Sequence, residues 1–302
     1  MQAIDQGGHW YVRIDDIDPP RIRQGAVQEI MSLLQQCGFF NRDNGGDHFE
    51  NRHSRLSTAT TAVTLQSDNN DRYRQTFDHL VSNNYVYACE CSRRQLRNQP
   101  VYPGTCRERQ LACKAQLENQ SGNQSHAIRF RAPDKNIQFN DKVFGLVEQN
   151  VAQEVGDFIV KRRDGLWSYQ LATIVDDWHD QVTEVVRGAD LLDNTPRQIA
   201  LIEQISGDQQ VSGQPACTQP QFLHVPVALG SNGKKLSKQT QALAIDASNP
   251  LPALLAAWQF LNQARPAKCE TIAQFWQHAE LSWDIDRIPA TQAIETDNHE
   301  FR

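Results

Sequence analysis

Apolar positions along this chain follow a helical spacing in some stretches and a strand-like spacing in others, so the pattern predicts a mixed α/β protein. The helical spacing predicts helices that end at Gly38 and at Asn83, a helix that begins at Thr195, and helices over residues 250–263 and 269–278. Apolar, β-branched or alternating runs predict strands over residues 10–14, 85–88, 126–131, 156–161 and 182–188. Strands that alternate with helices favour a parallel sheet.

The first predicted strand and helix enclose an acidic turn. Asp15, Asp16 and Asp18 follow the strand, and Asp18 is placed to cap a helix that starts with Pro19 and Pro20. Carboxylates at the carboxyl end of a strand lie where open α/β sheets bind ligands. The alternative is that Asp15 and Asp16 only cap and solvate the turn.

Three polar regions are predicted to lie outside the core. Residues 41–70 lack a sustained period and are interpreted as a surface insertion. Residues 162–165 contain Asp-Gly between two apolar runs, which predicts a hairpin. The polar chain after Pro289 is expected to fray.

The charge and the apolar content of the chain limit the classes of function that it can have. The 302 residues carry 30 lysines and arginines against 36 acidic residues, a net charge of −6. RNA binding would therefore need a local basic face, such as Lys161, Arg162 and Arg163, although a solvated hairpin tip also explains those three. No apolar run approaches ~18 residues and the first residues do not resemble a signal peptide, so we expect a soluble cytoplasmic protein.

The seven cysteines are interpreted as thiols or metal ligands rather than as a disulfide framework. Cys89 and Cys91 are two positions apart, and Cys106 follows past a Pro-Gly turn, so three thiolates can converge on one tetrahedral ion. A tyrosine oxygen, a water or a histidine could fill the fourth position. The alternative is that the three are free cysteines. The others are taken as ordinary thiols, namely Cys37, Cys113, Cys217 and Cys269.

A lysine-rich loop spans residues 232–239. Lys234, Lys235 and Lys238 follow Asn-Gly, and such a loop can bring ammonium groups against a polyphosphate, where negative charge builds up as a phosphoanhydride breaks. A solvated hairpin turn would have the same composition.

Arg187 ends the β-branched strand predicted over residues 182–188. A guanidinium in this position can bind a substrate carboxylate through two parallel hydrogen bonds. The alternative is a surface arginine paired with Asp190 or Glu184.

These motifs, in this order, resemble the catalytic core of class I aminoacyl-tRNA synthetases of the glutamyl type. Residues 233–238 resemble the KMSKS loop, residues 13–21 resemble the signature after the second strand, and the densest similarity lies at residues 164–165, 169, 176–177, 186–190 and 194–198. The resemblance implies a Rossmann-like parallel-sheet core that binds ATP through Lys235, Ser237 and Lys238, with both lysines catalytic. It also implies that Tyr169 and Arg187 bind the glutamate side chain. The Asp15 position, usually glutamate in the family, would contact the amino group.

The cysteine arrangement is similar to the small zinc module of the glutamyl-queuosine tRNA(Asp) synthetase family. The resemblance implies one structural Zn²⁺ held by Cys89, Cys91, Tyr102 and Cys106. It also implies three parts: a catalytic core over residues 1–87 and 166–248, an inserted zinc-binding module over residues 88–165, and a C-terminal helical segment over residues 249–302 with a frayed tail.

Only ~60 residues follow the lysine loop, too few for a separate anticodon-binding domain of typical size. The resemblance therefore implies a monomeric ligase that uses ATP with Mg²⁺ to convert L-glutamate to glutamyl-adenylate and transfers glutamate to the queuosine base in the anticodon of tRNA(Asp). The alternatives are a truncated glutamyl-tRNA synthetase that charges tRNA(Glu) and a non-catalytic tRNA- or nucleotide-binding relic. Nothing before Tyr11 resembles the HIGH-type motif, so we expect the first strand and that helix to be missing, either because the start codon is assigned too far downstream or because the chain is truncated.

Overall fold

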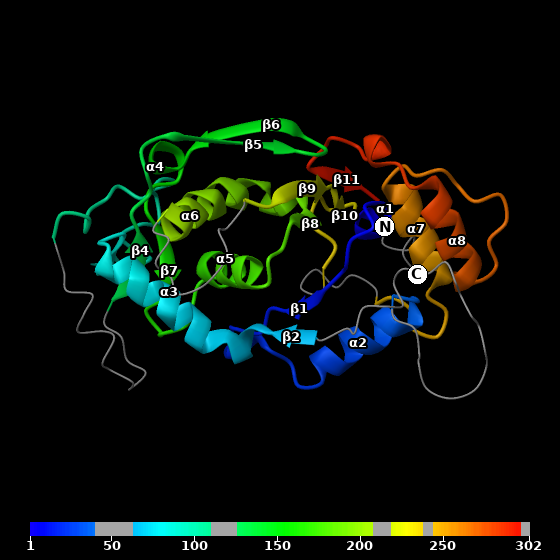
Figure 1. The fold of residues 1–302 in the computed structure, drawn as a ribbon, viewed down its shortest axis with the longest axis horizontal. Coiled ribbons are helices and arrows are strands. Elements are labelled where there is room, and N and C mark those ends of the chain that lie inside the picture. Colours follow the sequence, from blue (N-terminus) through cyan, green and yellow to red (C-terminus); the bar gives the residue numbers. More distant parts are fainter. Residues whose placement is uncertain (40–62, 110–125, 208–218, 238–243, 297–302) are drawn as a thin grey trace.

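The computed structural model describes residues 1–39, 63–109, 126–207, 219–237 and 244–296 (Figure 1). Its α-helices are α1 (Gln2–Asp5), α2 (Ala26–Gln36), α3 (Asn70–Ser82), α4 (Val151–Glu154), α5 (Tyr169–His179), α6 (Thr195–Gly207), α7 (Leu251–Phe260) and α8 (Ile272–Ser282). Its strands are β1 (Val12–Ile14), β2 (Val63–Leu65), β3 (Val86–Cys89), β4 (Ala127–Phe130), β5 (Asn136–Asp141), β6 (Gly145–Asn150), β7 (Phe158–Lys161), β8 (Glu184–Gly188), β9 (Gln221–Val225), β10 (Val227–Leu229) and β11 (Ala293–Glu295). Short 3₁₀ turns are η1 (Pro19–Arg21), η3 (Gln66–Asn69), η5 (Ala189–Asn194) and η7 (Ile285–Arg287).

The fold is a mixed α/β arrangement, and its strands form several small sheets. Parallel pairing joins β1 to β2, β8 to β9 and β10 to β11. The largest sheet has the order β6-β5-β9-β8 and the next has the antiparallel order β3-β4-β7. Within the described ranges, the parallel pairs therefore do not merge into one hydrogen-bonded sheet. The β5–β6 hairpin lies within residues 88–165, yet β5 pairs with β9 through Asp141 and Phe222.

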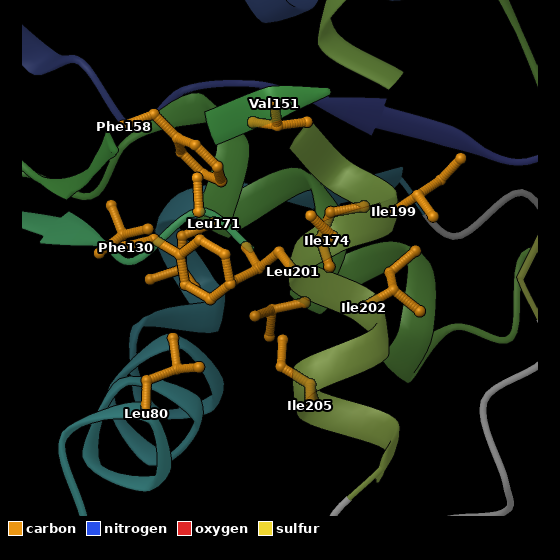
Figure 2. Close-up of a cluster of buried hydrophobic side chains, with 14 of the residues drawn as sticks. Leu80, Phe130, Val151, Phe158, Leu171, Ile174, Ile199, Leu201, Ile202 and Ile205 are labelled. Atoms are coloured by element: carbon orange, nitrogen blue, oxygen red, sulfur yellow. The ribbon is translucent and has the colours of Figure 1, made fainter. Parts of the chain in front are cut away.

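The main hydrophobic core lies between the helices α3, α5 and α6 and the strands around them. Leu171 and Ile174 of α5, Ile199 and Ile202 of α6 and Leu80 of α3 belong to one buried cluster (Figure 2). The side chains on α5 and α6 recur at spacings of three residues, as the helical pattern requires. Helix α5 packs against α6 in this core, and β8 leads through η5 into α6. The core therefore fixes the position of α5 relative to β8.

A second cluster joins the two ends of the chain. The indole nitrogen of Trp276 on α8 donates to the carbonyl of Cys37 after α2 (2.8 Å), and that of Trp283 donates to Gln2 (3.1 Å). Gly38 ends α2 with φ +81°, which confirms the predicted stop, and a Cβ there would lie 2.7 Å from Trp276 Nε1. Helices α7 and α8 lie beside α1 in Figure 1.

Several local predictions are confirmed. Helix α3 is followed by Asn84 with φ +58°, and β8 ends at the predicted Arg187-Gly188. Both C-terminal helices form at the predicted places. No helix in the described ranges combines the length and the hydropathy that crossing a bilayer requires.

The predicted cap of the first helix is wrong. Asp18 precedes only the short turn η1 and makes no side-chain capping hydrogen bond, while α2 starts eight residues later after Gly25. The Asp18 carboxylate instead binds Arg162 at 3.1 Å. An ion pair to a segment distant in sequence thus replaces the local cap.

The structure corrects two further strand predictions. The turn at residues 162–165 forms with Gly165 at φ +88°, but its second arm makes a single bridge through Trp167 before α5 begins. Ser168 causes the switch, because its hydroxyl accepts a hydrogen bond from the Leu171 amide as a helix N-cap. The half-buried strand expected over residues 126–131 is buried along its whole length as β4.

Two polar stretches are more ordered than expected. The last part of the predicted surface insertion forms β2 and η3, where Gln66 and Asn69 are buried. The residues after Pro289, which were expected to fray, include β11, which pairs in parallel with β10. In both cases pairing with a distant strand overrides polar composition.

Candidate functional site

Arg187 is held at the carboxyl end of β8 by neutral partners. Its Nη2 donates to Thr195 Oγ1 (2.6 Å) and to the carbonyl of Leu191 (3.4 Å), and its Nε donates to Nε2 of His224 (3.0 Å). Among the described residues no carboxylate lies within 4.0 Å of this guanidinium. The expected alternative partners are engaged elsewhere, because Asp190 binds Lys235 and Glu184 binds Lys142.

The environment of Arg187 is short of negative charge. Burial lowers the pKa of Arg187, and the nearby Tyr169 and Asp177 oppose this shift. Tyr169 is the first residue of α5 and lies close enough to Arg187 to affect its pKa. A partly buried cation beside a hydroxyl, with no carboxylate of its own, suits an acidic ligand.

The predicted residue Asp15 lies beside a second arginine at the carboxyl end of β1. Arg13 Nη1 donates to Asp177 (2.5 Å) and its Nε donates to Asp15 (3.2 Å). The Asp15 side chain is 45% exposed, so one side of its carboxylate faces solvent. Asp177 also acts electrostatically on Arg187, so it connects Asp15 and Arg13 with the β8 end of the site.

Asp176, next to Asp177 on α5, binds three polar side chains of other segments and was not predicted as a site residue. Its buried carboxylate accepts hydrogen bonds from Gln66 (2.8 Å), Asn69 (2.8 Å) and Tyr73 (2.7 Å). Burial raises the pKa of Asp176, and these hydrogen bonds counteract the shift. No sequence signal distinguished Gln66 and Asn69 from the polar stretch that precedes them.

The lysine loop begins as a tight hairpin. The Gly230 amide donates to the carbonyl of Lys234 (2.9 Å), and Leu229 bridges Lys235. Lys235 Nζ donates to Asp190 (2.6 Å), three residues after Arg187, which places this loop beside the end of β8. Ser237 is half-buried, and Lys238 lies outside the described residues.

The three predicted cysteines converge. The sulfur atoms of Cys89, Cys91 and Cys106 lie within 4.8 Å of one another, and all three residues are free cysteines. The Tyr102 hydroxyl lies 3.4 Å from Cys89 Sγ and 3.8 Å from Cys91 Sγ, and it accepts a hydrogen bond from the Cys106 amide (3.1 Å). Cys113 and Cys217 lie outside the described residues.

These distances fit a tetrahedral ion. Zn–S bonds of about 2.3 Å and Zn–O bonds of about 2.0 Å imply S···S and S···O edges of about 3.8 and 3.5 Å. The Cys91–Cys106 separation is 3.6 Å. Burial tends to raise the pKa of Cys89, but hydrogen bonds from Tyr102 and Arg129 outweigh burial and lower it. The donor set therefore suits a metal that binds thiolates.

The comparisons with known proteins agree on one family. Residues 1–263 match the model of the catalytic domain of class I tRNA synthetases (E and Q). A "Glutamyl-Q tRNA(Asp) synthetase" of Chromobacterium violaceum is 34% identical over 297 residues, covering 96% of this chain and 87% of the relative. One of Burkholderia pseudomallei is 38% identical over 298 residues, covering 94% and 88%.

The chain belongs to the glutamyl-Q tRNA(Asp) synthetase family. Among solved structures, a glutamate tRNA ligase from Elizabethkingia meningosepticum in complex with its amino acid has a TM-score of 0.67 at 20% identity, over 99% of this chain and 62% of that one. The chain spans less than two thirds of that ligase, and the similarity establishes a class I synthetase fold.

Most of the predicted site residues fall into two groups. Asp15, Tyr169, Arg187 and Lys235 lie at or beside the carboxyl ends of β1 and β8, whereas the cysteines and Tyr102 form a separate cluster around β3. The sequence interpretation assigned no site role to Asp141, Asp176 or His224. Asp176 lies in the segment at residues 176–177 that resembles the family, and His224 lies in the apolar run that precedes the lysine loop.

Proposed function

We propose that this protein uses ATP to convert L-glutamate to glutamyl-adenylate and then transfers glutamate to the queuosine base in the anticodon of tRNA(Asp). Membership of the glutamyl-Q tRNA(Asp) synthetase family supports the substrates. One observation in the structure carries the amino-acid specificity: Arg187 is partly buried at a strand end without a carboxylate partner among the described residues.

In this proposal the side-chain carboxylate of glutamate binds Arg187 and the Tyr169 hydroxyl. Glutamine would bind poorly, because its amide cannot neutralise the guanidinium and would bring an NH₂ group against a donor. Asp15 would accept a hydrogen bond from the amino group of the substrate on the side of its carboxylate that Arg13 leaves exposed.

ATP would bind between the strand ends and the lysine loop. Attack of the glutamate α-carboxylate on the α-phosphorus releases pyrophosphate, so Lys235 and Lys238 would stabilise the negative charge that develops on the departing phosphates. Ser237 would add a hydroxyl donor, and Mg²⁺ bound with ATP would supply further positive charge against the phosphates. Lys235 must then exchange Asp190 for a phosphate oxygen. The parallel pairs β1–β2 and β8–β9 would form the Rossmann-like core over residues 1–87 and 166–248.

One structural Zn²⁺ would bind Cys89, Cys91, Cys106 and Tyr102. The metal would join β3 to the turn after residue 103 and thereby order the module over residues 88–165, while residues 249–302 would form the helical segment. The tetrahedral edge lengths support this set. The metal would stabilise the fold and take no part in the reaction.

Three measurements test the proposal. The protein should catalyse glutamate-dependent ATP–pyrophosphate exchange without tRNA, and exchange with glutamine should be at least about 100-fold slower. It should attach labelled glutamate to tRNA(Asp) that carries queuosine, and should attach none to unmodified tRNA(Asp). Charging of tRNA(Glu) would instead select the ordinary glutamyl-tRNA synthetase activity, and binding of ATP or tRNA without exchange would select the non-catalytic alternative.

Lys238→Ala tests the loop. We expect exchange to fall by at least about 100-fold, because the lysine acts where charge develops in the transition state. Lys234→Ala, in the exposed turn of the same loop, is the matched control and should retain most of the exchange rate. Equal rates in the two variants would remove the loop from the mechanism.

A further inference from the structure

A buried carboxylate–imidazole pair lies directly behind Arg187. His224 is in β9, next to β8, and Asp141 ends β5 on the other side of β9. His224 Nδ1 lies 2.6 Å from Asp141 Oδ2, and both side chains are 0% exposed. Asp141 is itself fixed, because its Oδ1 accepts from the Val143 and Phe144 amides, each at 3.0 Å.

The hydrogen bonds determine which imidazole nitrogen carries the proton. Arg187 Nε can only donate, so His224 Nε2 at 3.0 Å must accept. The proton of the neutral ring is then on Nδ1, where it is donated to Asp141. Burial opposes the ionised state of Asp141, but the hydrogen bonds from His224 and the two amides outweigh burial and lower its pKa, which supports an ionised carboxylate. Arg187 therefore donates a hydrogen bond to His224, and His224 donates one to Asp141.

This arrangement has a consequence for the guanidinium. Its Nε donates to His224 and its Nη2 donates to Thr195, two acceptors that lie on different elements. Two fixed acceptors define the plane of a guanidinium, and bidentate binding of a carboxylate depends on that plane. All of these partners are neutral, so they orient the cation without neutralising it.

We propose that the buried Asp141–His224 pair positions Arg187 so that its guanidinium presents a fixed plane to the side-chain carboxylate of glutamate. His224 is a positioning residue, since it acts through Arg187. The inference rests on the proposed role of Arg187 as the carboxylate-binding group. A histidine that merely fills the core would also be buried, but its loss would not act selectively on one substrate.

The surroundings of the imidazole support this assignment of the proton. Among the described residues, Asp141 from β5 and Arg187 from β8 are the charged groups that contact the ring, and the Thr195 hydroxyl of α6 lies 3.3 Å from Nε2. A proton on Nε2 would point at Arg187 Nε–H, so Arg187 would lose its acceptor.

Two substitutions at position 224 separate positioning from packing. In His224→Asn the side-chain amide reaches Asp141 but leaves Arg187 Nε without its acceptor. In His224→Gln the longer amide can return an oxygen to the place of Nε2. We expect the KM for glutamate in ATP–pyrophosphate exchange to rise roughly 10-fold or more in His224→Asn and only a few-fold in His224→Gln, with the KM for ATP unchanged in both.

The two variants also provide the control for stability, because each replaces a buried ring by a smaller amide and both should lower Tm to a similar extent. Equal KM values for glutamate in the two variants, or a fall in kcat alone, would overturn the inference. Should neither variant fold, Asp141→Asn decides. Its amide oxygen would stay on the Val143 and Phe144 amides and its nitrogen would face Nδ1, which moves the ring proton to Nε2 and removes the acceptor of Arg187. A KM for glutamate equal to that of the wild type would overturn the inference.

Arg187→Gln separates this inference from the proposed function. If Arg187 binds the carboxylate and His224 positions it, the double variant Arg187→Gln/His224→Asn should have the same KM for glutamate as Arg187→Gln alone. A large effect of Arg187→Gln with none of His224→Asn would retain the function and reject the positioning role. If Arg187→Gln left the KM for glutamate unchanged, the proposed glutamate-binding role of Arg187 would be rejected.

Discussion

Arg129 is buried and Arg187 is partly buried, and the proposed origin of the anion that compensates each guanidinium differs. Within the described ranges, neither guanidinium has a carboxylate within ion-pair distance, in contrast to Arg13, which contacts Asp15 and Asp177. Arg129 is only 8% exposed. It donates to Cys89 Sγ (3.3 Å) and to the Asp157 carbonyl (2.6 Å), and lies 3.7 Å from the centre of the Tyr102 ring.

The contrast shows how each cation is compensated. A buried cation is costly without an anion, and Arg129 is enclosed by the cysteine cluster, whose thiolates and ion would bring excess negative charge. Arg187 contacts a hydroxyl, an imidazole and a carbonyl, and in the proposed function its anion would come from the substrate. In the proposed function, Arg129 therefore belongs to a permanent site, the zinc site, and Arg187 belongs to a site that the substrate fills and leaves.

The largest effect is expected when Arg187, the proposed partner of the substrate carboxylate, is replaced. Arg187→Gln should lower kcat/KM for glutamate by about 10³-fold, because a charged pair with two hydrogen bonds is removed, while ATP binding stays unchanged. Steady-state exchange at varied glutamate and ATP measures both. Arg21→Gln, whose side chain is 72% exposed, is the control. A uniform loss for both substrates would indicate misfolding instead.

The next effect concerns the permanent site. Cys91→Ser should abolish stoichiometric zinc in the purified protein and lower Tm by at least about 5 °C, since metal binding is coupled to folding of the module. Elemental analysis and thermal denaturation measure the two quantities. Cys269→Ser, at a free cysteine outside the cluster, should change neither. Full zinc content in Cys91→Ser would rule out the proposed ligand set.

A smaller effect is expected from the cation beside that cluster. Arg129→Gln should weaken zinc affinity about 10- to 100-fold, because neighbouring hydrogen bonds and charge tune a metal site. Competition with a chromogenic chelator measures the affinity, and Arg129→Lys should restore part of it. Arg131→Gln is the matched control, since Arg131 lies over Tyr87 rather than Tyr102. Identical affinities in the Gln variants at 129 and 131 would contradict the comparison.

The smallest effect is on the pH dependence of stability. The folded-state pKa of Asp141 is lowered, so its contribution is present above the unfolded pKa of about 3.9 and is lost as the pH falls through the still lower folded value. Asp141→Asn should therefore be less stable than wild type near pH 7, with the difference shrinking below about pH 4. Urea denaturation across this range measures it, and a difference that is constant with pH would contradict the assignment.

The parts of the site that depend on residue type and spacing within one segment were predictable from the sequence. A CxC pair with a third cysteine after a Pro-Gly turn predicted a cluster that the structure brings within 4.8 Å. An arginine at the end of a β-branched run predicted the position of Arg187 on β8. Both signals depend on residue type and spacing within one segment, and therefore can be read without knowing which segments become neighbours.

The hydrogen bonds that hold the site residues in place could not be predicted, because they join segments that are distant in sequence. Asp176 binds amides of Gln66 and Asn69 more than 100 residues away, from a stretch that reads as a surface insertion. Arg129 was assigned to a half-buried strand, since alternation cannot reveal that both faces of β4 are covered. Nothing in the residues 290–296 themselves indicated that β11 would pair with β10.

The sequence alone determined which segments become helices, where several of them end, and which residue types are available for chemistry, since turn conformation and periodicity involve only neighbours a few positions apart. The tertiary structure alone decided which of those residues act together. The pairing of β5 with β9 brings Asp141 to His224 across 83 positions, and the pairing of β9 with β8 brings His224 to Arg187. Strand register is set by the packing of the whole core, and no single segment contains that information.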